Sequence, residues 1–191
     1  MRHSFLTEPP PGLAVEAVYG EDLGSDGYVN NLTRVWAWRP DVLVAFSELR
    51  ATLMGSSGLS AREAAVLVAA TAAARGDSYC ALAWGARLAS LTDDATAAAV
   101  LRGEPAQVSE RESALAGWAR KVLGDPNATT AEDVAALRAA GLDDREIFEA
   151  TTWIALRLAF ATVNDALGAA PDPELRAKVP AAVRAAVTFG R

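Results

Sequence analysis

The chain has 191 residues, of which 51% are hydrophobic and 22% charged, so we expect one domain with a sizeable buried core rather than a disordered chain. Its formal net charge is −6 at pH 7, which leaves no excess of cations to neutralise phosphates and argues against nucleic acid as a partner. One cysteine and one histidine exclude an internal disulfide and argue against a histidine-based metal site or catalytic triad, so no metal or cofactor is expected.

The N-terminal segment carries prolines and an acidic residue where a secretion signal needs an apolar core. We expect residues 1–27 to form an extended arm, in which residues 13–20 form two short turns. The longest apolar run, residues 64–74, is about half of a membrane span. The sequence therefore predicts a cytoplasmic protein without a membrane partner.

Pro40 separates two predicted helices in the next part of the chain. A helix of about ten residues should follow Tyr28 and end before Pro40, because proline disfavours a helical residue before it. Pro40 itself suits the first turn of a helix over residues 40–54. The apolar stripe of that helix consists of Val42, Leu43, Phe46, Leu49 and Leu53.

The stretch from Leu59 to Ala89 contains the only cysteine. Ser60 and Glu63 form a Ser-x-x-Glu capping box, which predicts the start of a helix over residues 61–75. That helix is apolar on nearly every face and should lie at the centre of a bundle. Gly76 ends it, and Cys80 lies in the first turn of the next helix, from Ser78 to Ala89.

The rest of the chain repeats these helix-start signals. They occur in the pairs Ser109 with Glu112, Thr130 with Asp133, and Asp143 with Glu146, and a short helix at 93–102 precedes them. The last pair opens a long apolar helix ending near Leu167, and a C-terminal helix follows at about 173–187. No stretch alternates with the period of a strand. We predict an all-α, irregular helical bundle forming a single domain over residues 1–191, with its core at about 28–168.

Several motifs together resemble a known family. They are Gly-Tyr-Val-Asn-Asn-Leu at 27–32, Arg-Pro at 39–40, Leu-Ser-Ala-Arg-Glu at 59–63, Gly-Asp-Ser-Tyr-Cys at 76–80, Leu-Asp-Asp-Arg-Glu-Ile at 142–147, Asn-Asp-Ala-Leu-Gly at 164–168, and the closing Phe-Gly-Arg. In this order and spacing the chain resembles, over nearly its whole length, the alkylhydroperoxidase D (AhpD)-like or carboxymuconolactone decarboxylase-like superfamily, most closely its peroxidase-related branch. The resemblance implies an AhpD-like fold and a homo-oligomer, as a dimer, trimer or hexamer.

The family's active site is altered in this sequence. Relatives carry Cys-x-x-Cys at a helix start, then a histidine after three further residues, and a glutamate on the preceding helix. Aligned on Leu59, these positions are Asp77, Cys80, Trp84 and Ala65, so only Cys80 carries over and the CxxC motif is degenerate. Glu63 does not replace the glutamate, since two residues on a helix are roughly 200° apart.

Three functions remain open. The first is a thiol-dependent, antioxidant oxidoreductase that reduces hydroperoxides through Cys80 and is regenerated by an external thiol; the alternative role for Cys80 is an inert core residue. The second is a non-redox enzyme with a small-molecule substrate in a pocket around Asp77, Tyr79 and Trp84, where Asp77 acts as general acid or base; its alternative role is to cap the helix. The third is an inactive oligomer.

Four more polar side chains are candidates for lining the substrate pocket. The resemblance places the segment of Tyr28 and Asn31 near the active site, and Arg157 and Asn164 are candidates because they are polar residues within an otherwise apolar helix. For Arg157 the alternative is a charge paired at an interface, because arginine is rarely buried without a partner.

Overall fold

A computed structural model describes residues 3–191, and the described chain is helical without any strand. The N-terminal helices are α1 (Leu13–Ser25), α2 (Asn31–Trp36) and α3 (Pro40–Gly55). The middle helices are α4 (Ala61–Arg75), α5 (Ser78–Leu91), α6 (Asp94–Arg102) and α7 (Glu110–Gly124). The 3-10 turn η1 (Pro126–Ala128) then leads to α8 (Ala131–Ala139), α9 (Asp144–Ala166), α10 (Pro173–Lys178) and α11 (Ala181–Ala186). The predicted all-α bundle is confirmed.

Helix α4 is the centre of the bundle. Every residue from Ala64 to Ala72 is buried, and α4 packs against α5, α6, α7 and α9. The many alanines allow these helices to approach closely on all sides. A second close approach occurs at Gly85 of α5, where a Cβ atom would lie 2.7 Å from Val183 and 2.8 Å from Leu101. The sequence prediction of a centrally buried helix is confirmed.

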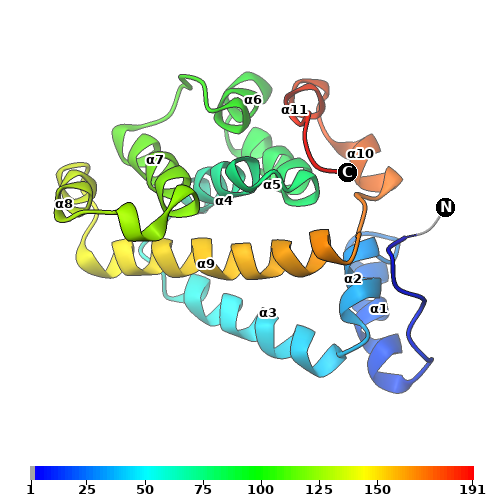
Figure 1. Cartoon of the computed structure of the whole chain (residues 1–191). Helices are drawn as coiled ribbons and strands as arrows, with labels where there is room; N and C mark the ends of the chain where they lie inside the picture. Colours follow the sequence, from blue (N-terminus) through cyan, green and yellow to red (C-terminus); the bar gives the residue numbers. More distant parts are fainter. Residues whose placement is uncertain (1–2) are drawn as a thin grey trace.

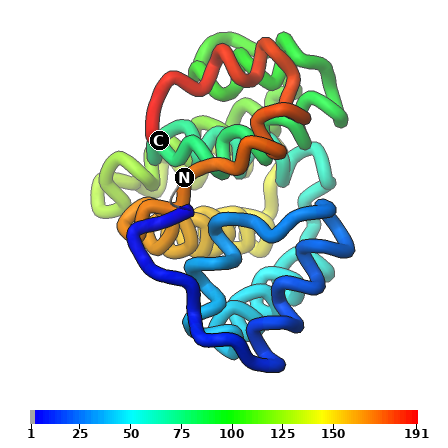
Figure 2. Tube along the Cα trace, turned by 90° about the vertical axis from the view of Figure 1, so that its right-hand side faces the viewer, coloured from blue at the N-terminus to red at the C-terminus, as the bar shows by residue number. Residues whose placement is uncertain are grey.

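Helix α9 divides the molecule. Figures 1 and 2 show α1, α2 and α3 on one side of α9, and α4 to α7 with α11 on the other. The two chain ends meet near one end of α9, where the guanidinium carbon of Arg191 lies 4.9 Å from the ring centre of Phe5. Within residues 3–191, no helix is both long and apolar enough to cross a membrane.

One arginine joins the starts of two long helices. The predicted capping boxes of α4 and α9 both form, so Glu63 and Glu146 each accept a hydrogen bond from the backbone of their own N-cap residue. Arg111 of α7 is ion-paired with both of these glutamates, its Nη2 lying 2.6 Å from Oε1 of Glu146. The similar helix starts at residues 59–63 and 142–146 are thereby held together by a third helix.

Three expectations about the chain ends were wrong. The expected extended arm over 1–27 contains α1, which has no side-chain cap but packs against α2 and α3 and buries Val18. Helix α2 has 6 residues, fewer than the expected ten. The expected C-terminal helix over 173–187 is two helices, because Pro180 lacks the backbone donor needed to continue α10.

The apolar stripe expected on α3 is only partly covered. None of its residues is buried, and Val42 and Leu49 remain 40% and 52% exposed. Helix α3 contacts α9, where Phe46 stacks against Phe160 with 5.8 Å between the ring centres. A groove therefore stays open between α3 and its neighbours α1 and α2.

We predict that Arg111→Ala lowers the free energy of unfolding by about 2 kcal/mol at pH 7, because it leaves two largely buried carboxylates without their common partner. Arg138→Ala is the control, since Arg138 and Asp144 form an exposed pair, and such pairs contribute little to stability. Urea denaturation measures both.

The effect of Arg111→Ala should depend on pH. Arg111 holds the pKa of Glu146 below its usual range, and for Glu63 hydrogen bonds from Ser60 and Arg111 outweigh the raising effect of burial. A depressed carboxyl pKa stabilises the fold above the unfolded value of about 4.3, and this contribution is lost as the pH falls through the folded pKa. The free energies of unfolding of the wild type and Arg111→Ala should therefore converge as the pH falls below about 4. A difference between them that is as large at this acidic pH as at pH 7 would contradict the prediction.

Candidate functional site

The turn between α4 and α5 places Cys80 at a helix start. Gly76 adopts a left-handed conformation (φ 75°) that ends α4, as glycine does without strain. Asp77 follows as the N-cap of α5, and its Oδ1 accepts a hydrogen bond of 3.0 Å from the backbone N–H of Cys80. The capping role considered for Asp77 is confirmed, and only one of its two carboxylate oxygens is used for it.

The Cys80 thiol is enclosed and neutral. Cys80 is 6% exposed, and burial is the main reason that the pKa of its thiol lies well above the usual range. The negative charge of Asp77 raises the pKa further, whereas the positive charge of Arg157 lowers it. The helix start therefore does not produce a resting thiolate here.

Arg157 of α9 brings a buried cation to the thiol. The residue is 8% exposed, and its guanidinium carbon lies 4.7 Å from the ring centre of Trp84 and 5.0 Å from that of Trp153. Burial lowers its pKa to about 10, against the opposing charges of Cys80 and Asp77. No carboxylate of residues 3–191 forms an ion pair with it, and a pairing of Arg157 at a subunit interface stays a prediction.

The charged groups share one small cavity. Cys80, Asp77, Arg157, Thr71 and Ala161 contribute to its walls, and its volume is about 10 Å³. Such a volume is at the lower limit for a single water molecule. Asp77 Oδ2 and Arg157 Nε are buried beside it without a hydrogen-bond partner among the described residues. The resting site therefore holds opposite charges in a nearly closed space.

Three other candidate residues lie away from this cavity. The hydroxyl of Tyr79 donates to Asp172, and the backbone N–H of Asn31 donates to the same carboxylate at 2.9 Å. The side chain of Asn31 also donates to the carbonyl of Ala170 at 2.9 Å, and Tyr28 stacks with Lys178. Burial, with the nearby charge of Asp172, raises the pKa of Tyr79. The structure thus places Tyr28, Asn31 and Tyr79 in the contact between α2, α5 and the start of α10.

Asn164 faces the interior two turns beyond Arg157 on α9. Its Oδ1 accepts a hydrogen bond of 2.8 Å from Nε1 of Trp36, while its Nδ2 is buried without a partner in the described chain. Trp36 in turn stacks on Phe160 at 5.1 Å. Of the candidate residues, Asp77, Cys80, Trp84 and Arg157 come together, and Asn164 supports the aromatic wall next to them.

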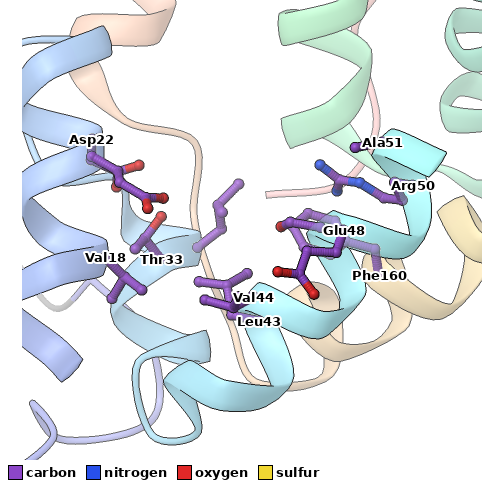
Figure 3. Close-up of a pocket in the computed structure, with 12 residues that line it drawn as sticks. Val18, Asp22, Thr33, Leu43, Val44, Glu48, Arg50, Ala51 and Phe160 are labelled. Carbon is purple, nitrogen blue, oxygen red and sulfur yellow. The ribbon is translucent and has the colours of Figure 1, made fainter. Parts of the chain in front are cut away.

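Arg50 is a residue of this region that the sequence analysis missed. Its guanidinium carbon lies 5.2 Å from the ring centre of Phe160 and 5.8 Å from that of Phe46. It lines a groove of about 480 Å³ between α1, α2 and α3, with Phe160 contributed by α9 (Figure 3). The available signal was its position four residues after Phe46, within the apolar stripe of α3, where a charge is unexpected.

Comparison with known proteins identifies the fold. No protein-family model matches the chain, and no curated protein matches its sequence. Among solved structures, it is similar to an uncharacterized peroxidase-related protein with an alkylhydroperoxidase AhpD core from Ralstonia eutropha JMP134, with TM-score 0.81 and 25% identity over 92% of this chain and 95% of that one. An uncharacterized peroxidase-related protein from Silicibacter sp. TM1040 gives TM-score 0.80 and 21% identity over 92% and 95%.

A third similar structure has a named activity. The debrominase Bmp8, solved as a cysteine-to-alanine variant in complex with 2,3,4-tribromopyrrole, gives TM-score 0.72 and 18% identity over 91% of this chain and 95% of that one. At this identity the likeness concerns the fold alone. The chain has an AhpD-like helical fold, as its sequence motifs predicted.

We predict that native Cys80 reacts slowly with iodoacetamide at pH 7, compared with the same chain unfolded in urea, because the thiol is buried and protonated. Asp77→Asn should increase the native rate, since asparagine still caps the helix but removes the charge that raises the thiol pKa. Mass spectrometry follows the labelling.

The matched control is Asp93→Asn, which changes the N-cap aspartate of α6 in the same way. Its labelling rate should equal that of the wild type. Labelling of the native protein as fast as the unfolded chain, or equal rates for wild type and Asp77→Asn, would contradict the described electrostatics.

Proposed function

We propose that this AhpD-like protein is a thiol-dependent oxidoreductase that reduces hydroperoxides through Cys80 alone. The observation that carries the proposal is the position of the thiol between a buried carboxylate and a buried guanidinium, each with an unpartnered polar atom. Burying a charged group without a partner lowers the stability of the fold, and groups buried in this way cluster at functional sites.

The unsatisfied atoms favour function over packing at this place. Buried polar side-chain atoms usually have a partner. Asp77 Oδ2, Arg157 Nε and Trp153 Nε1 have none among the described residues, although all belong to the surroundings of the thiol. An inert core cysteine would need none of these groups, and apolar residues of similar volume would pack more favourably around it.

In the proposed first step, Asp77 accepts the thiol proton and Arg157 stabilises the thiolate as it forms. The sulfur attacks the terminal oxygen of the hydroperoxide, the O–O bond breaks, and the departing alkoxide takes the proton from Asp77 and leaves as an alcohol. Cys80 becomes a sulfenic acid, having lost two electrons to the peroxide. Because the resting cavity is nearly closed, side chains around it must move before the peroxide can enter.

The second step needs a partner, since the chain has no other cysteine. An external thiol attacks the sulfenic sulfur, water leaves, and a mixed disulfide forms. A second external thiol then releases the Cys80 thiol and forms the external disulfide. The proposed partners are thus a small hydroperoxide and a small or protein thiol, and the homo-oligomer implied by the family resemblance belongs to the same proposal.

We predict that the wild-type protein consumes tert-butyl hydroperoxide in the presence of dithiothreitol and that Cys80→Ser abolishes this consumption. Asp77→Asn should lower kcat/KM by about 10²-fold or more, the range lost with a general base. Dimedone should trap the sulfenic acid at Cys80 in the wild type when the reductant is omitted. Peroxide loss is followed colorimetrically.

The same variants separate the alternatives. Asp93→Asn makes the same substitution at the N-cap of α6 and should retain full activity. Peroxide consumption that survives Cys80→Ser would sink the thiol mechanism. A substrate whose turnover survives Cys80→Ser but not Asp77→Asn would favour the non-redox enzyme with Asp77 as its acid or base.

A further inference from the structure

A second arginine without a carboxylate partner lies on α3. Arg50 is partly buried, and its Nε has no hydrogen-bond partner within residues 3–191. It forms no ion pair with a described carboxylate, although it lies two residues after Glu48. Burial lowers the pKa of Arg50. Among the described residues, the rings of Phe46 and Phe160 are the groups that stabilise this half-buried cation.

Arg50 and Arg157 belong to two neighbouring helices and face different spaces. Arg50 of α3 stacks on Phe160, and Phe160 lies three residues after Arg157 on α9. Arg157 lines the small cavity together with Asp77 and Cys80, whereas Arg50 lines the groove between α1, α2 and α3. Arg50 is therefore the cation of the groove, and a bound anion would supply the opposite charge that no carboxylate of residues 3–191 pairs with it.

The groove next to Arg50 has room for a small organic molecule. Its volume of about 480 Å³ lies in the range of ligand pockets. Leu32, Leu43, Val44 and Phe160 give it an apolar lining, and Figure 3 shows the guanidinium of Arg50 pointing into it from α3. An apolar groove with a cation at one end suits a molecule with one anionic group and an apolar body.

From this geometry we infer that the groove binds an amphipathic monocarboxylate, with its carboxylate on the guanidinium of Arg50 and its apolar body along Phe160 and α3. The reaction it would undergo rests on the proposed function: the substrate of Cys80 is then an organic hydroperoxide that carries one carboxylate. The binding itself does not depend on the thiol. Guanidinium groups suit this task, since they hold carboxylates through paired, charge-assisted hydrogen bonds.

The acidic residues of the groove limit the ligand to a single negative charge. Glu21, Asp22 and Glu48 also line it, and in Figure 3 the carboxylates of Asp22 and Glu48 lie apart from the guanidinium of Arg50. A second carboxylate on the ligand would approach these groups and be repelled. The same charges keep small dianions from occupying the arginine site.

The test is calorimetric titration of the full-length wild-type protein in a low-chloride buffer with hexanoate, hexanol and adipate. Hexanoate should bind in the millimolar range or tighter, at least about ten-fold more tightly than the neutral hexanol or the dianionic adipate, because each charge-assisted contact is worth that much. This comparison needs no variant and therefore holds even where a substitution affects folding.

Variants then locate the site. Arg50→Gln should weaken hexanoate binding at least about ten-fold. Arg50→Lys should weaken it less, since lysine keeps the positive charge but lacks the paired N–H donors of the guanidinium. Arg87→Gln, at an exposed arginine of α5, is the matched control and should bind as the wild type does. Circular dichroism checks that each variant is folded.

Three results would overturn the inference: equal binding of hexanoate and hexanol, equal weakening by Arg50→Gln and Arg87→Gln, or a groove filled by a second copy, seen as a dimer that must dissociate before hexanoate binds. None of these depends on peroxide consumption or on Cys80. If hexanoate binds but no peroxide is consumed, the carboxylate site stands and the thiol chemistry is rejected. If peroxide is consumed but hexanoate does not bind, the thiol chemistry stands and the carboxylate site is rejected.

Discussion

The burial of α4 on every face is the constraint on which the rest of the structure depends. From Ala64 to Ala72 the helix has neighbours on all sides, so it can carry neither a charge nor a large polar group without heavy cost. Ala65, the position at which the family resemblance implies a proton-relay glutamate, is fully buried among these neighbours. The charged groups next to Cys80 must therefore come from outside α4. Asp77 follows the C-terminal end of α4, and Arg157 comes from the neighbouring helix α9.

Asp77 combines two tasks that oppose each other at first sight. As the N-cap of α5 it fixes the backbone that presents Cys80, and as an anion it keeps the thiol protonated. The two oxygens divide these tasks, because Oδ1 accepts the backbone hydrogen bond while Oδ2 has no partner among the described residues. In the proposed reaction, the same carboxylate accepts the proton of the thiol when the hydroperoxide binds.

The fold and part of the site followed from local sequence signals. Capping pairs such as Ser60 with Glu63 act within one helical turn, so they predicted the long helices well, and Gly76 with Asp77 predicted the geometry around Cys80. Helix α1 was missed because it has no cap and depends on packing against α2 and α3. The hydrogen bond from Tyr79 to Asp172 and the stacking of Arg50 on Phe160 join residues more than ninety positions apart, which no local pattern encodes.

The presence of two guanidinium groups follows from charge balance in the proposed reaction. A thiolate at Cys80 needs a cation, and a substrate carboxylate in the same partly dry region needs one as well. If Arg157 served both anions, each would weaken its hold on the other, and the carboxylate would raise the thiol pKa at the moment when it has to fall. With Arg50 over Phe160 holding the carboxylate, Arg157 between Trp84 and Trp153 is left to stabilise the sulfur. The separation of the two arginines on two helices thus lets one site bind an anion and generate another.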